Sequence, residues 1–397
     1  MNRLLILLLV CLPVRALAAP PYHPQGICAG FPRLDLASLP GTCVGLVAKG
    51  LRFPRGIAVA GHDVYVVEMG GWVKGRGALL RFADDGKAPP QTLLTGLDEP
   101  NGIAIAPDGT IYLGLLGRVA RLRLAGGKAT LEDVITFLPD TGRHPLTALV
   151  VEPDGALDIN IGSATNNCEG PGKTPPNPAK PCPETAATPP RASIARFMPQ
   201  PGKILRFQDA QILATGLRNA IGLAILPDGK LAAAVNARDF INLADPHLSD
   251  ENEPRDTLDI IKPGADYGWP YCFDENRPSP EYPQFDCAKM TRPSVLLAPH
   301  AAPLGLLVYR GAGIAALKDT LLIPYHGYRA QGHRLMAMTL NAQGLPEGEP
   351  WQVIWGWNGK PGQAPMGSPV SLAELPDGSV LITEDHNGTL LRLAPLS

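Results

Sequence analysis

The sequence has few aromatic residues, little net charge and almost no long apolar run. Aromatic side chains make up 6% of the 397 residues, and the formal net charge is -2. A nearly neutral chain offers no electrostatic footprint for nucleic acid or for an anionic membrane. Beyond the start of the chain no segment reaches about 18 uninterrupted apolar residues, so we expect no membrane span in the mature protein. No stretch of about 12 residues has the apolar spacing of an amphipathic helix.

The one marked apolar run lies at the start of the chain. Arg3 precedes the stretch from Leu4 to Leu12, which is too short to cross a bilayer. Small residues follow at Ala16-Leu17-Ala18, in the pattern that a signal peptidase cleaves. We therefore predict a signal peptide over residues 1–18 and a mature protein that is periplasmic or secreted.

Pairs of cysteines separated by two residues are missing, with or without a following histidine, which argues against zinc and against covalent haem. Once Cys11 leaves with the signal peptide, the remaining cysteines fall into three pairs that each close a short loop. Free thiols are unusual in an exported protein, so we predict three local disulfides. They are Cys28–Cys43, Cys168–Cys182 and Cys272–Cys287.

A strand–turn–strand unit recurs along the chain. The segments 94–114 and 214–234 align without a gap over most of their length, and segments beginning near residues 52, 147, 302 and 368 fit the same frame. Most carry a Pro-Asp-Gly turn, and Asp-Gly supplies the backbone conformation that a tight hairpin needs. Glycine and proline number 43 each, which suits frequent turns. Six such units with little helix predict an all-β fold, a six-bladed β-propeller, rather than a β-sandwich.

The propeller is predicted over residues 51–397, after a proline-rich lead-in over residues 19–50. Two proline-rich loop insertions interrupt the repeat, one over residues 163–202 and the other over residues 236–257 and 264–300. If the blades run in the usual order, the Pro-Asp-Gly hairpins lie on one face of the propeller. Both insertions then wall the opposite end of the central channel, where propellers usually bind ligands.

Equivalent positions in the repeats predict a ring of polar residues at that mouth. Each position lies nine residues before a Pro-Asp-Gly proline, or is aligned with such a position. His144 and Arg218 occupy it in the third and fourth units, and Asn219 follows Arg218. A lone histidine before a strand is more often a solvated loop residue. Here two independent repeats place His144 and Arg218 at the same position, which favours a candidate active site. The other members of the ring are Arg52, Asp98, Ala301 with His300 beside it, and Gly367.

The motifs set in this frame resemble the soluble glucose/sorbosone dehydrogenase family over roughly residues 45–396. Their order and spacing are closest to the sorbosone-type branch. The resemblance implies an exported six-bladed propeller that uses pyrroloquinoline quinone (PQQ) together with calcium. The motifs are the segment from His144 to Gly162-Ser163, GLRNAIGLA (216–224), VNARDF (235–240), ADYGWPYC (265–272), HAAPLGLLVYRG (300–311), PYHGYRAQGHRL (324–335) and PDGSVLITEDHNGTLLRL (376–393).

The resemblance also implies roles for individual residues. His144 matches the base that takes the hydroxyl proton while a hydride passes to the quinone, a task that suits histidine because its pKa is near neutral. Arg218 and Asn219 match the pair beside the quinone, where an arginine would stabilise developing negative charge. Asn236 and Arg238 match a segment that approaches the cofactor. The implied calcium ligands are Asp239, Asp256 and the backbone of Tyr267, since oxygen ligands suit this ion.

The sequence departs from the family at two places. Some relatives have two arginines just before the first strand of the last blade, where this chain has Ser368 and Val370. We predict that Arg334 supplies this contact to the cofactor instead, with Arg329 and Arg52 as alternatives. A calcium-binding glutamate expected in the family is Thr257 here.

The predicted function is that of a quinone-dependent dehydrogenase which oxidises a sugar or a related alcohol or aldehyde. Its partners would be a small carbohydrate and a separate electron acceptor, because the chain has no haem motif. A calcium-dependent propeller lactonase ranks lower, since Asp98 is the only carboxylate on the predicted ring. A non-catalytic propeller that binds a sugar or a protein partner stays open, because the expected arginine pair is missing.

Overall fold

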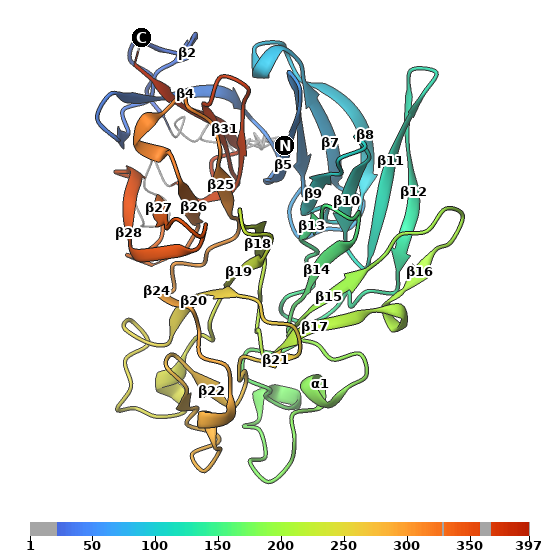
Figure 1. Ribbon diagram of the computed structural model, residues 1–397, viewed down its shortest axis with the longest axis vertical. Coiled ribbons are helices and arrows are strands. Elements are labelled where there is room, and N and C mark those ends of the chain that lie inside the picture. The colour runs from blue at the N-terminus through green and yellow to red at the C-terminus, as the bar shows by residue number, and fades with distance from the viewer. Residues whose placement is uncertain (1–21, 328, 358–366, 397) are drawn as a thin grey trace, which may run out of the picture.

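The computed structural model describes residues 22–327, 329–357 and 367–396, and strands account for nearly all of their regular structure (Figure 1). Helix in these residues is limited to α1 (Pro183–Ala186) and short 3-10 turns. Across the same ranges, no helix is long and apolar enough to cross a membrane. The predicted signal peptide, residues 1–18, lies outside the described residues.

The strands form the six blades of a propeller, which confirms the predicted all-β fold. The innermost strands of successive blades contact one another, and the last contacts the first, so the ring is closed. From inside to outside, blade 1 is β5 (Pro54–Ala60), β6 (Asp63–Glu68), β7 (Gly77–Phe82) and β8 (Gln91–Leu97); blade 2 is β9 (Gly102–Ile105), β10 (Ile111–Leu115), β11 (Arg118–Ala125) and β12 (Lys128–Thr136), edged by β16 (Leu205–Arg206); blade 3 is β13 (Leu149–Val151), β14 (Leu157–Ile161), β15 (Ser193–Phe197) and β17 (Gln211–Thr215), edged by β21 (Ala265–Asp266). Blade 4 is β18 (Gly222–Ile225), β19 (Leu231–Val235), β20 (Arg255–Ile260) and β24 (Val295–Pro299); blade 5 is β25 (Leu307–Tyr309), β26 (Thr320–Tyr325), β27 (Arg334–Leu340) and β28 (Pro346–Trp355); blade 6 is β29 (Pro369–Glu374), β30 (Val380–Glu384), β31 (Thr389–Pro395) and β4 (Thr42–Lys49).

Glycines near the start of the inner strands let neighbouring blades approach closely. A Cβ on Gly56 would lie 2.5 Å from the carbonyl oxygen of Asn101, and one on Gly102 would lie 2.8 Å from that of Thr147. Both distances are too short for real atoms, so these repeat positions need glycine. The inner strands surround a channel of about 280 Å³ whose side chains are mainly apolar. Polar groups that could carry chemistry therefore gather at the mouth of the channel.

Blade 6 is completed by residues from near the start of the chain. β4 pairs antiparallel with β31, so a single sheet joins the two ends of the propeller. These residues belong to the predicted lead-in, so the propeller extends N-terminal to the predicted boundary at residue 51. β3 (Ala37–Ser38) likewise adds an edge strand to blade 5, while β1 (Ile27–Cys28) and β2 (Phe31–Pro32) form a separate hairpin.

The three predicted disulfides, Cys28–Cys43, Cys168–Cys182 and Cys272–Cys287, are all present. Two of them lie in the insertions, which pack together beside blades 3 and 4, around α1 and β22 (Cys272–Phe273), at the bottom of the view in Figure 1. β22 pairs with β23 (Arg277–Pro278). Nε1 of Trp269 donates to the carbonyl oxygen of Asn166 over 3.2 Å, and the hydroxyl of Tyr271 accepts from the backbone N–H of Cys182 over 2.7 Å. These contacts join the two insertions to each other, whereas the prediction that residues 163–202 line the mouth of the channel stays a prediction.

Candidate active site

A cavity of about 530 Å³ opens at the end of the propeller where the inner strands begin. Its lining comes from the loops that lead into the first strands and from those that join second strands to third strands, as the repeat frame predicts. Charged and titratable side chains alternate there with apolar ones such as Leu146, Ile221 and Leu304. The charged and titratable residues are Arg55, Arg143, Arg218, Arg329, His144, His300, His326, Asp239 and Asp256.

His144 lies just before β13 and is held through one ring nitrogen. Its Nδ1 lies 2.9 Å from the hydroxyl oxygen of Ser163 and 3.2 Å from the carbonyl oxygen of the same residue. The Ser163 hydroxyl donates its hydrogen to the carbonyl of Thr165 over 2.7 Å, so it must accept from His144. Nδ1 therefore carries the ring proton, and Nε2 keeps a lone pair on a side chain that lines the cavity.

The local backbone brings His144 and Ser163 together. Gly162 precedes Ser163, and a Cβ there would lie 2.4 Å from the carbonyl oxygen of His144. Only glycine permits this approach. Burial lowers the pKa of His144 well below 6.5, and the charges of Arg218 and Arg143 lower it further. The imidazole is thus neutral near pH 7, the form that a general base requires.

Arg218 is buried, and all of its guanidinium N–H groups have protein acceptors. Nε and NH2 donate to the backbone carbonyl and the side-chain oxygen of Asn166, over 3.0 and 2.7 Å. NH1 donates to the carbonyls of Asn236 and Ala237, and NH2 also lies 3.4 Å from Asp239. Burial lowers its pKa to about 10, so it remains a cation. Arg218 therefore ties three loops together and contributes charge, rather than a free donor, to the cavity.

Asp239 lies among positive charges. Its Oδ2 accepts from Arg143 NH2 over 2.6 Å, and its Oδ1 is 3.5 Å from Nδ1 of His300. Burial would raise the pKa of Asp239, but the contacts with His300, Arg218 and Arg143 outweigh burial and lower it. Asp239 is thus a fixed anion that balances part of the charge of the arginines.

Asn219 and Asn236 form a short chain of amides at the cavity wall. Nδ2 of Asn219 donates to Oδ1 of Asn236 over 3.1 Å, and Nδ2 of Asn236 donates to the carbonyl of Pro303 over 2.9 Å. Oδ1 of Asn219 is buried and has no hydrogen-bond partner among the described residues. The sequence prediction that both residues lie with His144 and Arg218 is consistent with this arrangement.

Of the predicted calcium ligands, Asp239 and Asp256 line the cavity and Tyr267 does not. Both oxygens of Asp256 accept backbone N–H groups, from Ala237 over 2.8 Å and from Ala302 over 2.7 Å, and burial raises its pKa to about 6. Asp239 already has cationic partners, which oppose binding of a further cation. Tyr267 lies away from the cavity, beside a small pocket of about 70 Å³. As arranged here, these three residues do not fit calcium.

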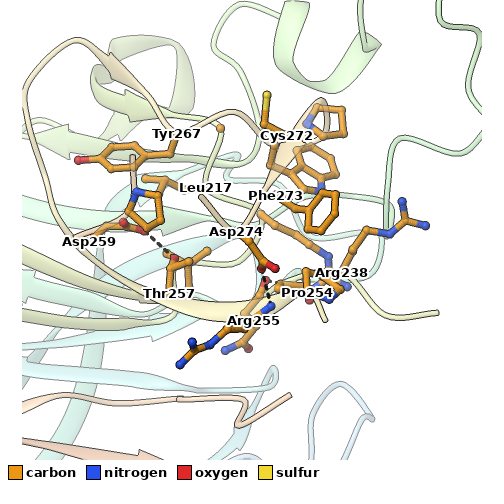
Figure 2. A pocket seen from close by; sticks show the side chains of 18 of the residues that line it. Leu217, Arg238, Pro254, Arg255, Thr257, Asp259, Tyr267, Cys272, Phe273 and Asp274 are labelled. Atoms are coloured by element: carbon orange, nitrogen blue, oxygen red, sulfur yellow. Dashed lines mark hydrogen bonds between the residues drawn. The ribbon is translucent and has the colours of Figure 1, made fainter. Parts of the chain in front are cut away.

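The small pocket beside Tyr267 also contains Arg238. Tyr267 and Asp259 lie at one end of it, and Phe273 and Arg238 lie at the other (Figure 2). NH1 of Arg238 is 2.6 Å from Oε2 of Glu281 in the second insertion. Arg238, predicted to bind the cofactor, thus joins the two parts of the second insertion and does not line the larger cavity.

Arg334, which was predicted to replace the missing arginine pair, lies outside the cavity. Arg334 donates to the backbone carbonyls of Gly332 and Ala330 and does not line the cavity. Arg52 pairs with Glu68 over 3.0 Å, again outside it. Arg329 is the alternative that does line the cavity, where it pairs with Asp250.

Sequence reasoning missed several residues that line the cavity. Arg143 and Arg55 add positive charge, and Trp72 and Phe240 add exposed aromatic faces, with 56% and 50% of their surface accessible. Arg143 was identifiable as the neighbour of His144, and Arg55 as the neighbour of the repeat glycine Gly56. No repeat signal marks Trp72 or Phe240.

Comparisons with known proteins agree with this fold. A protein of Trichoderma reesei from carbohydrate-active enzyme family AA12 superposes with a TM-score of 0.75 at 18% identity, over 94% of this chain and 100% of the other. The PQQ domain of pyranose dehydrogenase from Coprinopsis cinerea gives 0.73 at 19% identity, over 92% and 99%. PQQ-bound aldose sugar dehydrogenase from Streptomyces coelicolor gives 0.59 at 18% identity, over 90% and 99%. At these identities the likeness shows the fold.

Sequence comparison identifies the family of the chain. An uncharacterised protein of Borreliella burgdorferi is 26% identical over 200 residues, 48% of this chain, and the chain spans about half the length, 50%, of that curated relative. Residues 114–344, which include His144, Arg218 and both insertions, match the glucose/sorbosone dehydrogenase family. The chain therefore belongs to the glucose/sorbosone dehydrogenase family.

Proposed function

We propose that the protein is a PQQ-dependent dehydrogenase that oxidises a sugar, with His144 as the general base. The observation that carries this proposal is the state of His144. It is a neutral imidazole whose proton is fixed on Nδ1, and its side chain lines a cavity of about 530 Å³. Such a group accepts a proton from a hydroxyl as that hydroxyl is oxidised.

The charge of the cavity supports an anionic cofactor. Four arginines line it against two aspartates, and PQQ is a planar tricarboxylate. Guanidinium groups match carboxylates in shape and charge. When bound, PQQ would supply the hydride acceptor. Arg55, Arg143 and Arg329 are the residues best placed to hold its carboxylates, with Arg218 and the amides of Asn219 and Asn236 around it. We assign no residue to calcium.

The remaining residues would position the substrate and the proton. Ser163 keeps the Nδ1 proton of His144 in place, so the substrate proton goes to Nε2. Arg143 and Arg218 keep the imidazole neutral beforehand. The faces of Trp72 and Phe240 suit the apolar face of a sugar ring, whose hydroxyls the charged side chains would bind. We propose a glucose- or sorbosone-type sugar as the substrate and a separate electron acceptor. We place the protein in the periplasm or outside the cell, where its three disulfides would be stable.

Reconstitution tests the proposal. The purified protein is loaded with PQQ, with and without calcium, and reduction of an artificial dye is followed for a panel of aldoses, sorbosone and polyols. Turnover that requires both PQQ and a sugar supports the dehydrogenase. PQQ binding without turnover of any panel member would favour a non-catalytic sugar-binding propeller. Hydrolysis of sugar lactones without PQQ would favour a lactonase.

A further inference from the structure

Arg55 is a buried cation whose hydrogen-bonding capacity is not used up. It belongs to β5, at the inner edge of blade 1, and only 5% of its surface is exposed. Its side chain lines the cavity. Nε has no hydrogen-bond partner among the described residues, although the atom is buried. A buried charged donor without an acceptor is costly, so such a group in a cavity points to a ligand that supplies the acceptor.

Among the described residues, the carboxylate paired with Arg55 is that of Asp385, which also contacts a histidine. NH1 of Arg55 lies 3.4 Å from Oδ2 of Asp385, which is beyond a strong hydrogen bond. Both oxygens of Asp385 lie closer to Nε2 of His326, at 3.0 and 3.1 Å. Asp385 therefore offsets only part of the charge of Arg55, and its better contact is with the histidine.

The backbone of Arg55 is fixed by the neighbouring blade. Its carbonyl accepts from the hydroxyl of Thr383 in β30 over 2.6 Å, and β5 packs against both β29 and β30. Blade 1 lies opposite blade 4 in a closed ring of six, so Arg55 and Arg218 present positive charge from opposite sides of the mouth. An anion with carboxylates at both ends would meet both charges.

We propose that Arg55 binds a carboxylate group of the ligand in this cavity. Resting on the proposed function, we assign that carboxylate to PQQ. An acidic sugar, such as a uronate, carries the same group and is the other source of a carboxylate. Arg55 would bind the ligand, and His144 would accept the proton.

The test is a binding titration that needs no turnover. PQQ is titrated into the metal-free and cofactor-free protein by calorimetry, for wild type, Arg55→Gln, Arg55→Lys and the control Arg52→Gln. Arg52 lies three residues away, is exposed and pairs with Glu68 outside the cavity. We expect Arg55→Gln to raise the dissociation constant for PQQ by about tenfold or more, Arg55→Lys to do so less, and Arg52→Gln to leave it unchanged. Thermal melts of each variant check that the fold persists.

Two further probes separate the explanations. A planar ortho-quinone without carboxylates should bind wild type and Arg55→Gln equally, because the variant loses only a carboxylate contact. A weaker binding of this probe by Arg55→Gln would mean that the cavity itself has changed, and would overturn the assignment. If PQQ binds both proteins equally and glucuronate binds only wild type, the carboxylate site stands but belongs to the substrate. Equal binding of PQQ and of glucuronate by both proteins overturns the site. If wild type binds no PQQ, the proposed function fails, and the cofactor assignment of Arg55 fails with it.

Discussion

At the residue scale, the surroundings of His144 set its protonation state. Burial and the charges of Arg218 and Arg143 lower its pKa well below 6.5. The unfolded chain takes up this proton near pH 6.5, whereas the folded protein takes it up only at lower pH. The folded state therefore binds fewer protons below pH 6.5, and this group reduces stability as the pH falls through that range. The same shift keeps the imidazole neutral over the whole neutral range, as the proposed role of a base requires.

The pH dependence of turnover follows from this shift. We expect the acidic limb of the rate profile of the PQQ-loaded protein to lie well below pH 6.5. Arg143→Gln should move the limb upward, since it removes a cation beside His144 and leaves Asp239 less compensated. Arg310→Gln, an exposed arginine away from the cavity, serves as the control. A limb at pH 6.5 in wild type, or no displacement in Arg143→Gln, would contradict the account.

The pKa of Asp259 is shifted in the opposite direction to that of His144, so its effect on stability has the opposite pH dependence. Burial raises its pKa from 3.8 to about 7, so the folded protein keeps a proton that the unfolded chain releases. The contribution to stability is present below about pH 4 and is lost as the pH rises towards 7, at up to about 1.4 kcal/mol per pH unit. Asp259→Asn should therefore gain stability relative to wild type between pH 5 and pH 8, as measured by urea unfolding. Asp84→Asn, at an exposed position, is the matched control, and equal pH dependence in wild type and Asp259→Asn would refute the claim.

At the scale of elements, the two insertions depend on a few buried contacts for their position. Arg238 lies in the first part of the second insertion, just after β19, and its partner Glu281 lies in the second part. Both side chains are more than nine-tenths buried, and Glu281 also accepts from Nδ2 of Asn167 in the first insertion over 2.5 Å. One carboxylate thus links the first insertion to both parts of the second.

Removal of that carboxylate should loosen the insertions. Glu281→Ala leaves the Arg238 guanidinium buried without its partner, which costs on the order of 3 kcal/mol. We expect a lower urea midpoint and faster proteolysis within residues 163–202 or 264–300. Glu132→Ala breaks an exposed arginine pair on blade 2 and should change both far less. Unchanged protease resistance in Glu281→Ala would show that the insertions are held by other contacts.

At the scale of the whole molecule, closure of the ring depends on β4. This strand supplies the outer edge of blade 6, and the Cys28–Cys43 disulfide anchors its first residues. A covalent loop with a sequence separation of 15 restricts the unfolded chain and stabilises the fold by about 3 kcal/mol in the chain-entropy model. The double variant Cys28→Ser/Cys43→Ser should therefore unfold at a lower temperature in calorimetry. No change in the melting temperature would mean that β4 closes the ring without this crosslink.

The repeat frame predicted the propeller because each unit is one local hairpin with a glycine where neighbouring strands meet. It did not predict β4, since an outer strand from the other end of the chain carries no Pro-Asp-Gly signal. Three disulfides were predictable because each joins cysteines that are near in sequence. The repeat pattern therefore predicts structure that depends on neighbouring residues. It does not predict the pairing of β4 with β31, which joins residues from opposite ends of the chain.

The same limit applies to the candidate site. His144, Arg218 and Asn219 were found because the frame fixes where each first strand begins. Arg52 and Asp98 hold the same frame position but do not line the cavity, because Glu68 and the backbone N–H of Gly75 bind them elsewhere. The contacts of Asp239 with Arg143 and His300 join residues that are distant in sequence, so its surroundings were not predictable.

The central claim, that His144 is the base of a quinone-dependent sugar dehydrogenase, is tested most directly by turnover of His144→Ala. The PQQ-loaded variant is compared with wild type and with His62→Ala, which removes an exposed histidine paired with Asp85 on blade 1. Dye reduction is measured with the best sugar of the panel, and PQQ affinity is measured in parallel. The account predicts that His144→Ala loses about 10²- to 10⁴-fold in turnover while its PQQ affinity and that of His62→Ala stay at the wild-type value. Full turnover by PQQ-loaded His144→Ala would contradict it.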